Sequence, residues 1–180
     1  YILDGKLKRL ISAYGSTYAR DGMATVTTGS TATLPLTENS IDYIFTDPPF
    51  GENIYYADLN YLVESWHRVV TDAEPEAIVD RFKDKGLQYY HTLMRRCFHE
   101  YHRVLKPGRW MTVVFSNSSA AVWNAIQAAL QQAGFVVANV SAMDKQQGSY
   151  RQVTSTTAVK QDLVISAYKP NGGLEDRFSK

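Results

Sequence analysis

The residues with the clearest chemical meaning form the run Thr46-Asp47-Pro48-Pro49-Phe50-Gly51, which directly follows the apolar stretch 41–45. Pro48 favours an extended conformation for Asp47, and the two prolines remove two backbone N–H donors. The groups that remain are a carboxylate and carbonyl oxygens, all of which accept hydrogen bonds. This arrangement suits a group that only donates, such as an NH2 on a planar ring, and Phe50 could stack on that plane.

Such a set of acceptors could activate an amine. An exocyclic amine on a nucleobase is a poor nucleophile because its lone pair is delocalised into the ring. If the Asp47 carboxylate and the Pro48 carbonyl each accept one N–H, the nitrogen is drawn toward tetrahedral geometry and its lone pair can point at an electrophilic methyl group. The alternative is that Asp-Pro-Pro is only a rigid turn, but its place after an apolar strand favours the functional interpretation.

Apolar spacing predicts the elements that would position this run. Helices are expected at 1–20, 57–70, 87–105 and 118–133, a short helix at 75–82, and strands at 23–28, 41–45, 110–115, 135–140 and 162–168. Strands that alternate with helices indicate an α/β fold with a mostly parallel sheet covered on both faces. The last two strands have no helix between them, so they are predicted to form a C-terminal antiparallel hairpin.

Composition narrows the class of protein. The chain has 180 residues, a net charge of +1, a hydrophobic fraction of 44% and one cysteine, Cys97. One cysteine excludes an internal disulfide framework, and the hydrophobic fraction excludes a disordered chain. No window approaches 18 uncharged apolar residues, so no membrane span is expected. The net charge of +1 produces no strong overall electrostatic attraction to nucleic acid. Three histidines on one predicted helix, at 91, 99 and 102, lack a fourth ligand on their face, so no metal site is expected.

The run 40–50 resembles the catalytic motif of amino-group DNA methyltransferases, which modify adenine N6 or cytosine N4 with S-adenosylmethionine. Residues 51–66 are similar to large prokaryotic adenine-specific DNA methylases of restriction–modification type. Further segments, 101–109, 132–135 and 161–165, are similar to parts of class I methyltransferases. The resemblance covers about residues 24–170 and implies a partial Rossmann-like class I methyltransferase sheet.

The resemblance also implies roles for individual residues. The catalytic set, which would hold and stack a flipped DNA base, is Asp47, Pro48, Pro49 and Phe50. The cofactor set is Gly29, Ser30, Thr31 and Thr46, where related enzymes often have an acid in place of Ser30 or Thr31. The substrate set is Gly51, Tyr55, Tyr56, Asn117, Lys145 and Arg151.

Several members of the substrate set have an ordinary structural alternative. Tyr55 and Tyr56 could line the base pocket or pack on a helix. Asn117 could contact substrate or belong to a helix cap. Lys145 and Arg151 lie in a polar loop that suits phosphate positioning and suits a plain surface loop equally well.

The chain also lacks the family's glycine-rich cofactor loop: it contains no Gly-x-Gly pair, and no apolar strand lies upstream to carry one. We therefore expect a fragment or module, divided into an N-terminal helical segment (1–22), the catalytic part (23–170) and a flexible tail (171–180). The rest of the methyltransferase chain or a partner subunit would supply the loop, and the chain alone should bind the cofactor poorly.

The expected activity is methyl transfer to adenine N6 of DNA in a prokaryotic cytoplasm. Two alternatives stay open: an RNA guanine-N2 methyltransferase, and a catalytically incomplete module that binds nucleic acid or a partner. Release-factor glutamine methyltransferases rank lower because they usually have Asn in place of Asp47.

Overall fold

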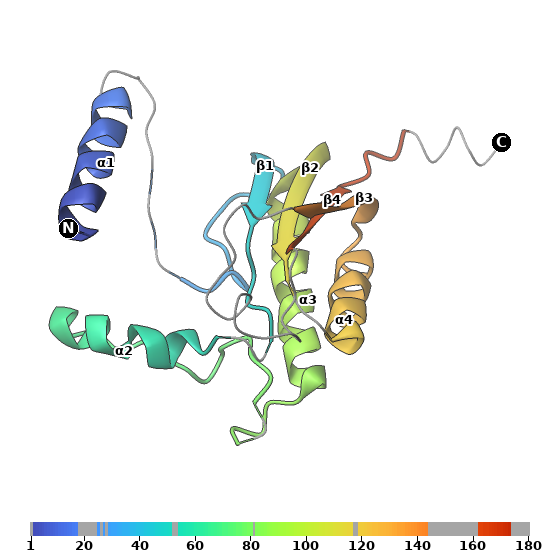
Figure 1. Ribbon diagram of the computed structural model, residues 1–180. Coiled ribbons are helices and arrows are strands. Elements are labelled where there is room, and N and C mark those ends of the chain that lie inside the picture. The colour runs from blue at the N-terminus through green and yellow to red at the C-terminus, as the bar shows by residue number, and fades with distance from the viewer. Residues whose placement is uncertain are drawn as a thin grey trace.

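A computed structural model describes residues 2–17, 25, 27, 29–51, 54–80, 82–116, 119–143 and 162–173. Its centre is a four-stranded sheet in the order β1-β2-β4-β3 (Figure 1). The strands are β1 (Ile41–Thr46), β2 (Leu105–Phe115), β3 (Val136–Met143) and β4 (Asp162–Tyr168). β1 and β2 are parallel, whereas β4 is antiparallel to both β2 and β3. Three of the four strands thus run in one direction, and the predicted C-terminal hairpin is confirmed.

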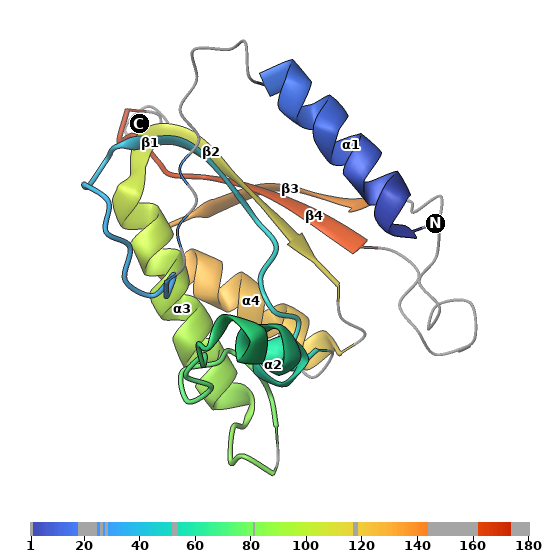
Figure 2. The same ribbon diagram turned by 90° about the vertical axis from the view of Figure 1, so that its left-hand side faces the viewer.

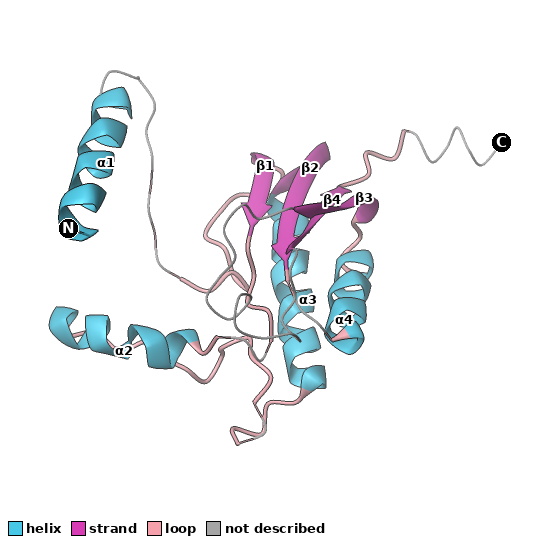
Figure 3. Ribbon diagram, in the orientation of Figure 1, coloured by secondary structure: helices cyan, strands magenta, loops and turns pink. Residues whose placement is uncertain are grey.

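In the part of the chain that the structure describes, four helices accompany the sheet (Figure 3): α1 (Ile2–Thr17), α2 (Tyr56–His67), α3 (Leu87–Val104) and α4 (Ala120–Gln132). α3 and α4 lie together on one side of the sheet (Figure 2). Buried residues of α3, such as Tyr90, Met94 and Phe98, recur at helical spacing and join Met111, Val113 and Phe115 of β2 in one core. The carboxyl end of β1 therefore sits beside the buried stripe of α3.

The other face of the sheet differs from the prediction that both faces are covered. Tyr43 and Phe45 on β1 and Trp110 on β2 are 54%, 65% and 46% exposed. Among the described residues, no helix covers these side chains, because α1 stands apart from the sheet and α2 projects away from it (Figure 1). α2 contains no buried residue at all. The prediction of two covered faces is therefore wrong for the described part of the chain.

The segment between α2 and α3 also differs from the prediction of a short helix at 75–82. Its described residues form turns and two isolated bridges, Gly51 with Ile78 and Asp80 with Lys85. The backbone of Asp80 exchanges hydrogen bonds of 2.8 and 2.9 Å with Lys85, and the buried Lys85 Nζ donates to the carbonyls of Ala73 and Glu74. These bonds form turns and bridges, and they replace the i to i−4 backbone bonds of a helix.

The remaining elements lie close to their predicted bounds. α3 ends at Val104, one residue early, because Leu105 already pairs with Ile41 in the sheet. β2 is longer than predicted, since residues 105–109 belong to it. The predicted strand at 23–28 lies largely outside the described residues, and Thr25 and Thr27 are not in a strand. None of the helices in the described ranges is long and apolar enough to cross a membrane.

The segment before β1 is tied to the C-terminal part of α3. The guanidinium of Arg103 donates to the carbonyls of Leu34 and Leu36, and the Glu100 carboxylate accepts from the Leu34 N–H. The N–H groups of Asn39 and Ser40 continue this contact to the last carbonyls of α3. These bonds bring residues 29–31 close to the end of β1.

Candidate functional site

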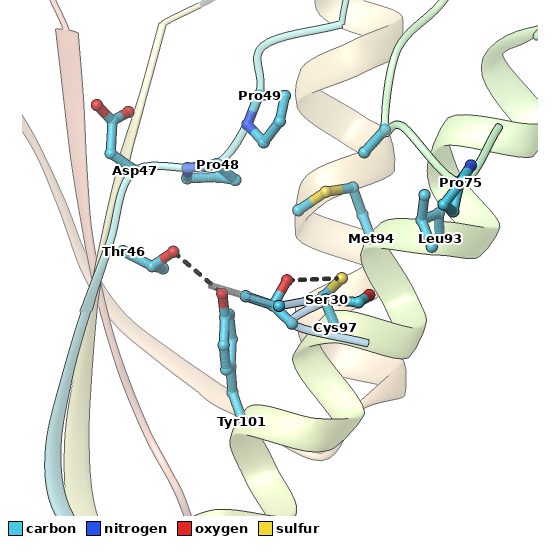
Figure 4. Close-up of a pocket in the computed structure, with 13 residues that line it drawn as sticks. Ser30, Thr46, Asp47, Pro48, Pro49, Pro75, Leu93, Met94, Cys97 and Tyr101 are labelled. Carbon is cyan, nitrogen blue, oxygen red and sulfur yellow. Dashed lines mark hydrogen bonds between the residues drawn. The ribbon is translucent and has the colours of Figure 1, made fainter. Parts of the chain in front are cut away.

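A cavity of about 290 Å³ lies at the carboxyl end of β1 (Figure 4). Four segments border it: residues 29–31, 46–49 and 75–77, and one face of α3. In open α/β sheets, ligands bind in the crevice at the carboxyl ends of the strands. The cavity therefore occupies the position that the chain's topology favours for a ligand.

Seven residues that the sequence predicts as functional border this one cavity. They are Gly29, Ser30, Thr31, Thr46, Asp47, Pro48 and Pro49, which include the whole predicted cofactor set and three of the four predicted catalytic residues. The first three come from the segment tied to α3, and the other four from the end of β1. The structure thus joins two runs that are fifteen or more residues apart in sequence.

The opposite wall was not predicted from the sequence. Leu93, Met94, Cys97 and Tyr101 of α3 border the cavity, together with Pro75 and Ala77. The four helical residues have the spacing i, i+1, i+4 and i+8, which places them on one face. Amphipathic spacing identifies this face as inward, but only the packing of α3 beside β1 shows that it borders a cavity.

Two hydrogen bonds connect the cavity's walls. The Thr31 hydroxyl donates to Cys97 Sγ over 3.3 Å, and the hydroxyls of Thr46 and Tyr101 lie 3.3 Å apart. Burial raises the pKa of the Cys97 thiol, while the hydrogen bond from Thr31 acts in the opposite direction. Cys97 is therefore a neutral, buried thiol in the cavity wall at neutral pH, as the sequence predicts for a structural cysteine.

The Asp-Pro-Pro turn is anchored at its prolines, and its acid is exposed to solvent. Pro48 is buried, Pro49 is half-buried and Asp47 is exposed. The buried hydroxyl of Tyr90 donates to the Pro49 carbonyl over 2.7 Å, and burial raises the pKa of Tyr90. The Asp47 carboxylate points away from Tyr101 and Cys97 (Figure 4). The turn thus holds its acid at the mouth of the cavity, where a substrate group can reach it.

Phe50 and Gly51 continue the turn toward the core. Phe50 is half-buried and meets Phe115 edge-on, with ring centroids 5.3 Å apart, and it is not part of the cavity wall. Gly51 is buried with φ at +91°, a conformation that glycine adopts readily, and its carbonyl accepts from the Val79 N–H. Gly51 therefore acts as a turn residue between the site and the segment 75–79.

The other predicted substrate residues lie elsewhere. Tyr55 occupies the N-cap position of α2 without a side-chain capping bond, and Lys83 Nζ lies 5.7 Å from its ring centroid. Tyr56 is 42% exposed. Neither borders the cavity. Asn117, Lys145 and Arg151 are outside the described residues. Within the described ranges no three His, Cys, Asp or Glu side chains are placed to hold a metal, and His102 packs edge-on against Phe135.

The sheet order, the reversed β4 and the cavity at the end of β1 define a partial Rossmann-like fold of the class I methyltransferase type. The chain belongs to the DNA methylase family of N6 and N4 methyltransferases, whose family model matches residues 41–173. The matched residues include Asp47, Pro48, Pro49 and all four strands of the described sheet. A comparison with curated proteins found no match.

Solved structures similar to this chain include a putative DNA modification methylase of Thermus thermophilus in complex with S-adenosyl-L-methionine. It is 16% identical over 80% of this chain and 54% of its own, with a TM-score of 0.47. The M1.HpyAVI complex with SAM is 17% identical over 77% and 47%, with a TM-score of 0.38. A putative methyltransferase bound to the Haloferax volcanii Trm112 activator is 14% identical over 87% and 66%, with a TM-score of 0.48. The chain spans about half the length of the two DNA methylases.

Proposed function

We propose that residues 23–170 form the catalytic part of an S-adenosylmethionine-dependent methyltransferase that modifies adenine N6 in DNA, in a cytoplasmic restriction–modification system. Family membership supports DNA methylation. The observation that carries the assignment to this site is that the Asp-Pro-Pro turn and the segment 29–31 border the same cavity.

The turn suits an exocyclic amine as substrate. Asp47 is exposed at the cavity mouth, and its two prolines add no N–H donors, so the turn presents acceptors to an incoming NH2 group. Hydrogen bonds from the amine to the Asp47 carboxylate and the Pro48 carbonyl would orient the nitrogen lone pair and stabilise its developing positive charge. Phe50 would act from the rim of the site, because its ring is half-buried against Phe115.

The residues of the cavity fit the adenosyl part of the cofactor. Leu93, Met94 and Pro75 offer apolar surface to a flat ring, and Ser30, Thr31 and Thr46 offer hydroxyls. A volume of about 290 Å³ is just below the range of roughly 300–1,000 Å³ for ligand pockets, which suits a nucleoside-sized group and not the whole cofactor. When bound, S-adenosylmethionine supplies an electrophilic methyl group.

The methionine end of the cofactor needs a second set of groups, which we propose comes from another segment or a partner subunit with a glycine-rich loop. The free edge of β1 is a suitable place for it. Within the described residues, β1 pairs only with β2, and its Tyr43 and Phe45 are exposed. Lys145 and Arg151 stay proposed phosphate contacts, and Asn117 a proposed substrate contact.

The test is methyl transfer from labelled S-adenosylmethionine to DNA and to RNA, in parallel, by the protein with its loop-bearing segment or partner present. Asp47→Ala is expected to lower kcat by about 10²–10³-fold, the range for removing one preorganised transition-state contact. The matched control is Asp42→Ala, which removes an exposed carboxylate of β1 that is paired with Lys106 of β2. Transfer to RNA alone would contradict the DNA assignment, and unimpaired transfer by Asp47→Ala would contradict the site.

A further inference from the structure

Tyr90 holds the Asp-Pro-Pro turn from behind. Its hydroxyl donates to the Pro49 carbonyl over 2.7 Å, and its side chain has no exposed surface. It is the fourth residue of α3 and lies 41 residues away from Pro49 in sequence. Because a buried hydroxyl has one O–H proton to donate, this bond fixes the orientation of the Pro49 carbonyl relative to α3.

The turn is held again at its far end. The Gly51 carbonyl accepts from the Val79 N–H, and Glu76 Oε1 accepts from the Ala57 N–H at the start of α2. Pro75 and Ala77 of this same segment border the cavity. Pro48 is buried and its ring restricts the backbone next to Asp47, so the position of Asp47 depends on where Pro49 is held.

We propose that Tyr90 is a positioning residue for the amine-binding turn: through the Pro49 carbonyl it fixes where the Asp47 carboxylate and the Pro48 carbonyl stand relative to the cavity. Tyr90 itself does not border the cavity, so it acts through Pro49 and not on substrate. The inference rests on the proposed function for its catalytic consequence, whereas the ordering of the turn is independent of it.

The test compares Tyr90→Phe with Tyr89→Phe. Tyr89 is the adjacent residue and makes the same type of bond, from its hydroxyl to the Glu74 carbonyl over 2.7 Å, but away from the turn. Both changes remove one oxygen atom and leave the ring. In the protein with its loop-bearing segment or partner, we expect Tyr90→Phe to lower kcat by about 10–100-fold with KM for DNA within about twofold, since a small misplacement of a catalytic group is costly. Tyr89→Phe should leave both near the wild-type values.

A second measurement, hydrogen exchange, reports the stability of the turn and does not depend on catalysis. Hydrogen exchange of the peptide that covers residues 46–58 should quicken by about tenfold in Tyr90→Phe and stay unchanged in Tyr89→Phe. Exchange in α4 should be unchanged in both variants, which separates local loosening from loss of the fold. Quickened exchange throughout the chain would mean that Tyr90 is only a core residue and would overturn the proposal.

Failure of the proposed methyl transfer and failure of the positioning role of Tyr90 would give different results. If the wild type transfers no methyl group but Tyr90→Phe still loosens only residues 46–58, the proposed function fails and the anchoring of the turn stands. If Tyr90→Phe leaves kcat and the exchange of residues 46–58 unchanged, the positioning role is wrong whatever the protein methylates.

Discussion

At the scale of single residues, the site combines an exposed acid with buried side chains that hold it in place. Asp47 is exposed, whereas Pro48, Tyr90 and Cys97 around it are buried. A buried support limits the mobility of the substrate-facing group, because packing locks the rotamer of the support. This division explains why Asp47 and Pro48 could be predicted from local turn chemistry, whereas the bond from Tyr90, 41 residues away in sequence, could not.

Cys97 offers a direct chemical probe of the cavity, because it is the chain's one cysteine and borders the proposed adenosyl site. Since burial raises its pKa, alkylation by iodoacetamide at pH 7 should be slower than that of a free thiol and should quicken as the pH rises. S-adenosylmethionine at ten times its dissociation constant should slow alkylation about tenfold, because only the free form reacts.

The control for this protection is free methionine at the same concentration, which lacks the adenosyl part and should not protect. Mass spectrometry of the peptide that contains Cys97 follows the reaction. Equal alkylation rates with and without S-adenosylmethionine would place the cofactor outside this cavity.

At the scale of elements, α3 organises the site because it holds both neighbouring segments. Glu100 is the centre of one contact: its carboxylate accepts from the Leu34 N–H and from Arg103 Nε, each over 2.9 Å. The hydrogen bond from Arg103 and then that from Leu34 lower the pKa of Glu100 to about 2. Segment 29–40 therefore depends on an ionised Glu100.

The lowered pKa predicts how stability depends on pH. A carboxyl group with a folded-state pKa of about 2 and an ordinary value of 4.5 stabilises the fold fully above pH 4.5, and the contribution is lost as the pH falls toward 2. Glu100→Gln should therefore be less stable than the wild type at pH 6, and the gap in unfolding free energy should narrow between pH 4.5 and 2. Urea unfolding at pH 6, 4 and 2.5 measures it.

The control for this change is Glu74→Gln, at an exposed position, which should alter the unfolding free energy by less than about 0.5 kcal/mol. A gap between Glu100→Gln and the wild type that stays constant from pH 6 to 2.5 would show that Glu100 does not act through its charge.

The accuracy of the sequence predictions follows from how local the determining interactions are. The strand at 162–168 was placed at its observed bounds, because an apolar run between polar residues needs no distant partner to be recognised. The helix predicted at 75–82 was wrong because Ile78 forms a bridge with the distant Gly51 and Asp80 forms one with Lys85, neither of which local spacing reveals. The α3 wall of the cavity was missed for the same reason, since only the packing of α3 beside β1 places Leu93 and Met94 there.

At the scale of the whole molecule, the described chain leaves one face of its sheet and the apolar stripes of two helices exposed. Phe45, Trp66 on α2 and Leu10 on α1 are 65%, 84% and 63% exposed. On the sheet, Phe45 shares its face with Tyr43 and the neighbouring Trp110, and a large exposed apolar patch of this kind marks an interaction site in soluble proteins. This pattern agrees with the proposal that another segment or subunit completes the methyltransferase site.

The proposal that another segment or subunit supplies the glycine-rich loop predicts how the 180-residue chain alone binds its cofactor. The cavity has groups for an adenosyl moiety, but the sequence has no Gly-x-Gly turn to let backbone N–H groups approach the methionine carboxylate. We therefore expect S-adenosylmethionine to bind the chain with a Kd weaker than about 1 mM, and adenosine to bind within about threefold of it, because the methionine end adds few contacts. Titration calorimetry with both ligands measures this. Micromolar binding of S-adenosylmethionine with much weaker binding of adenosine would show that the chain itself holds the methionine end, and the partner that we propose for the glycine-rich loop would then be unnecessary.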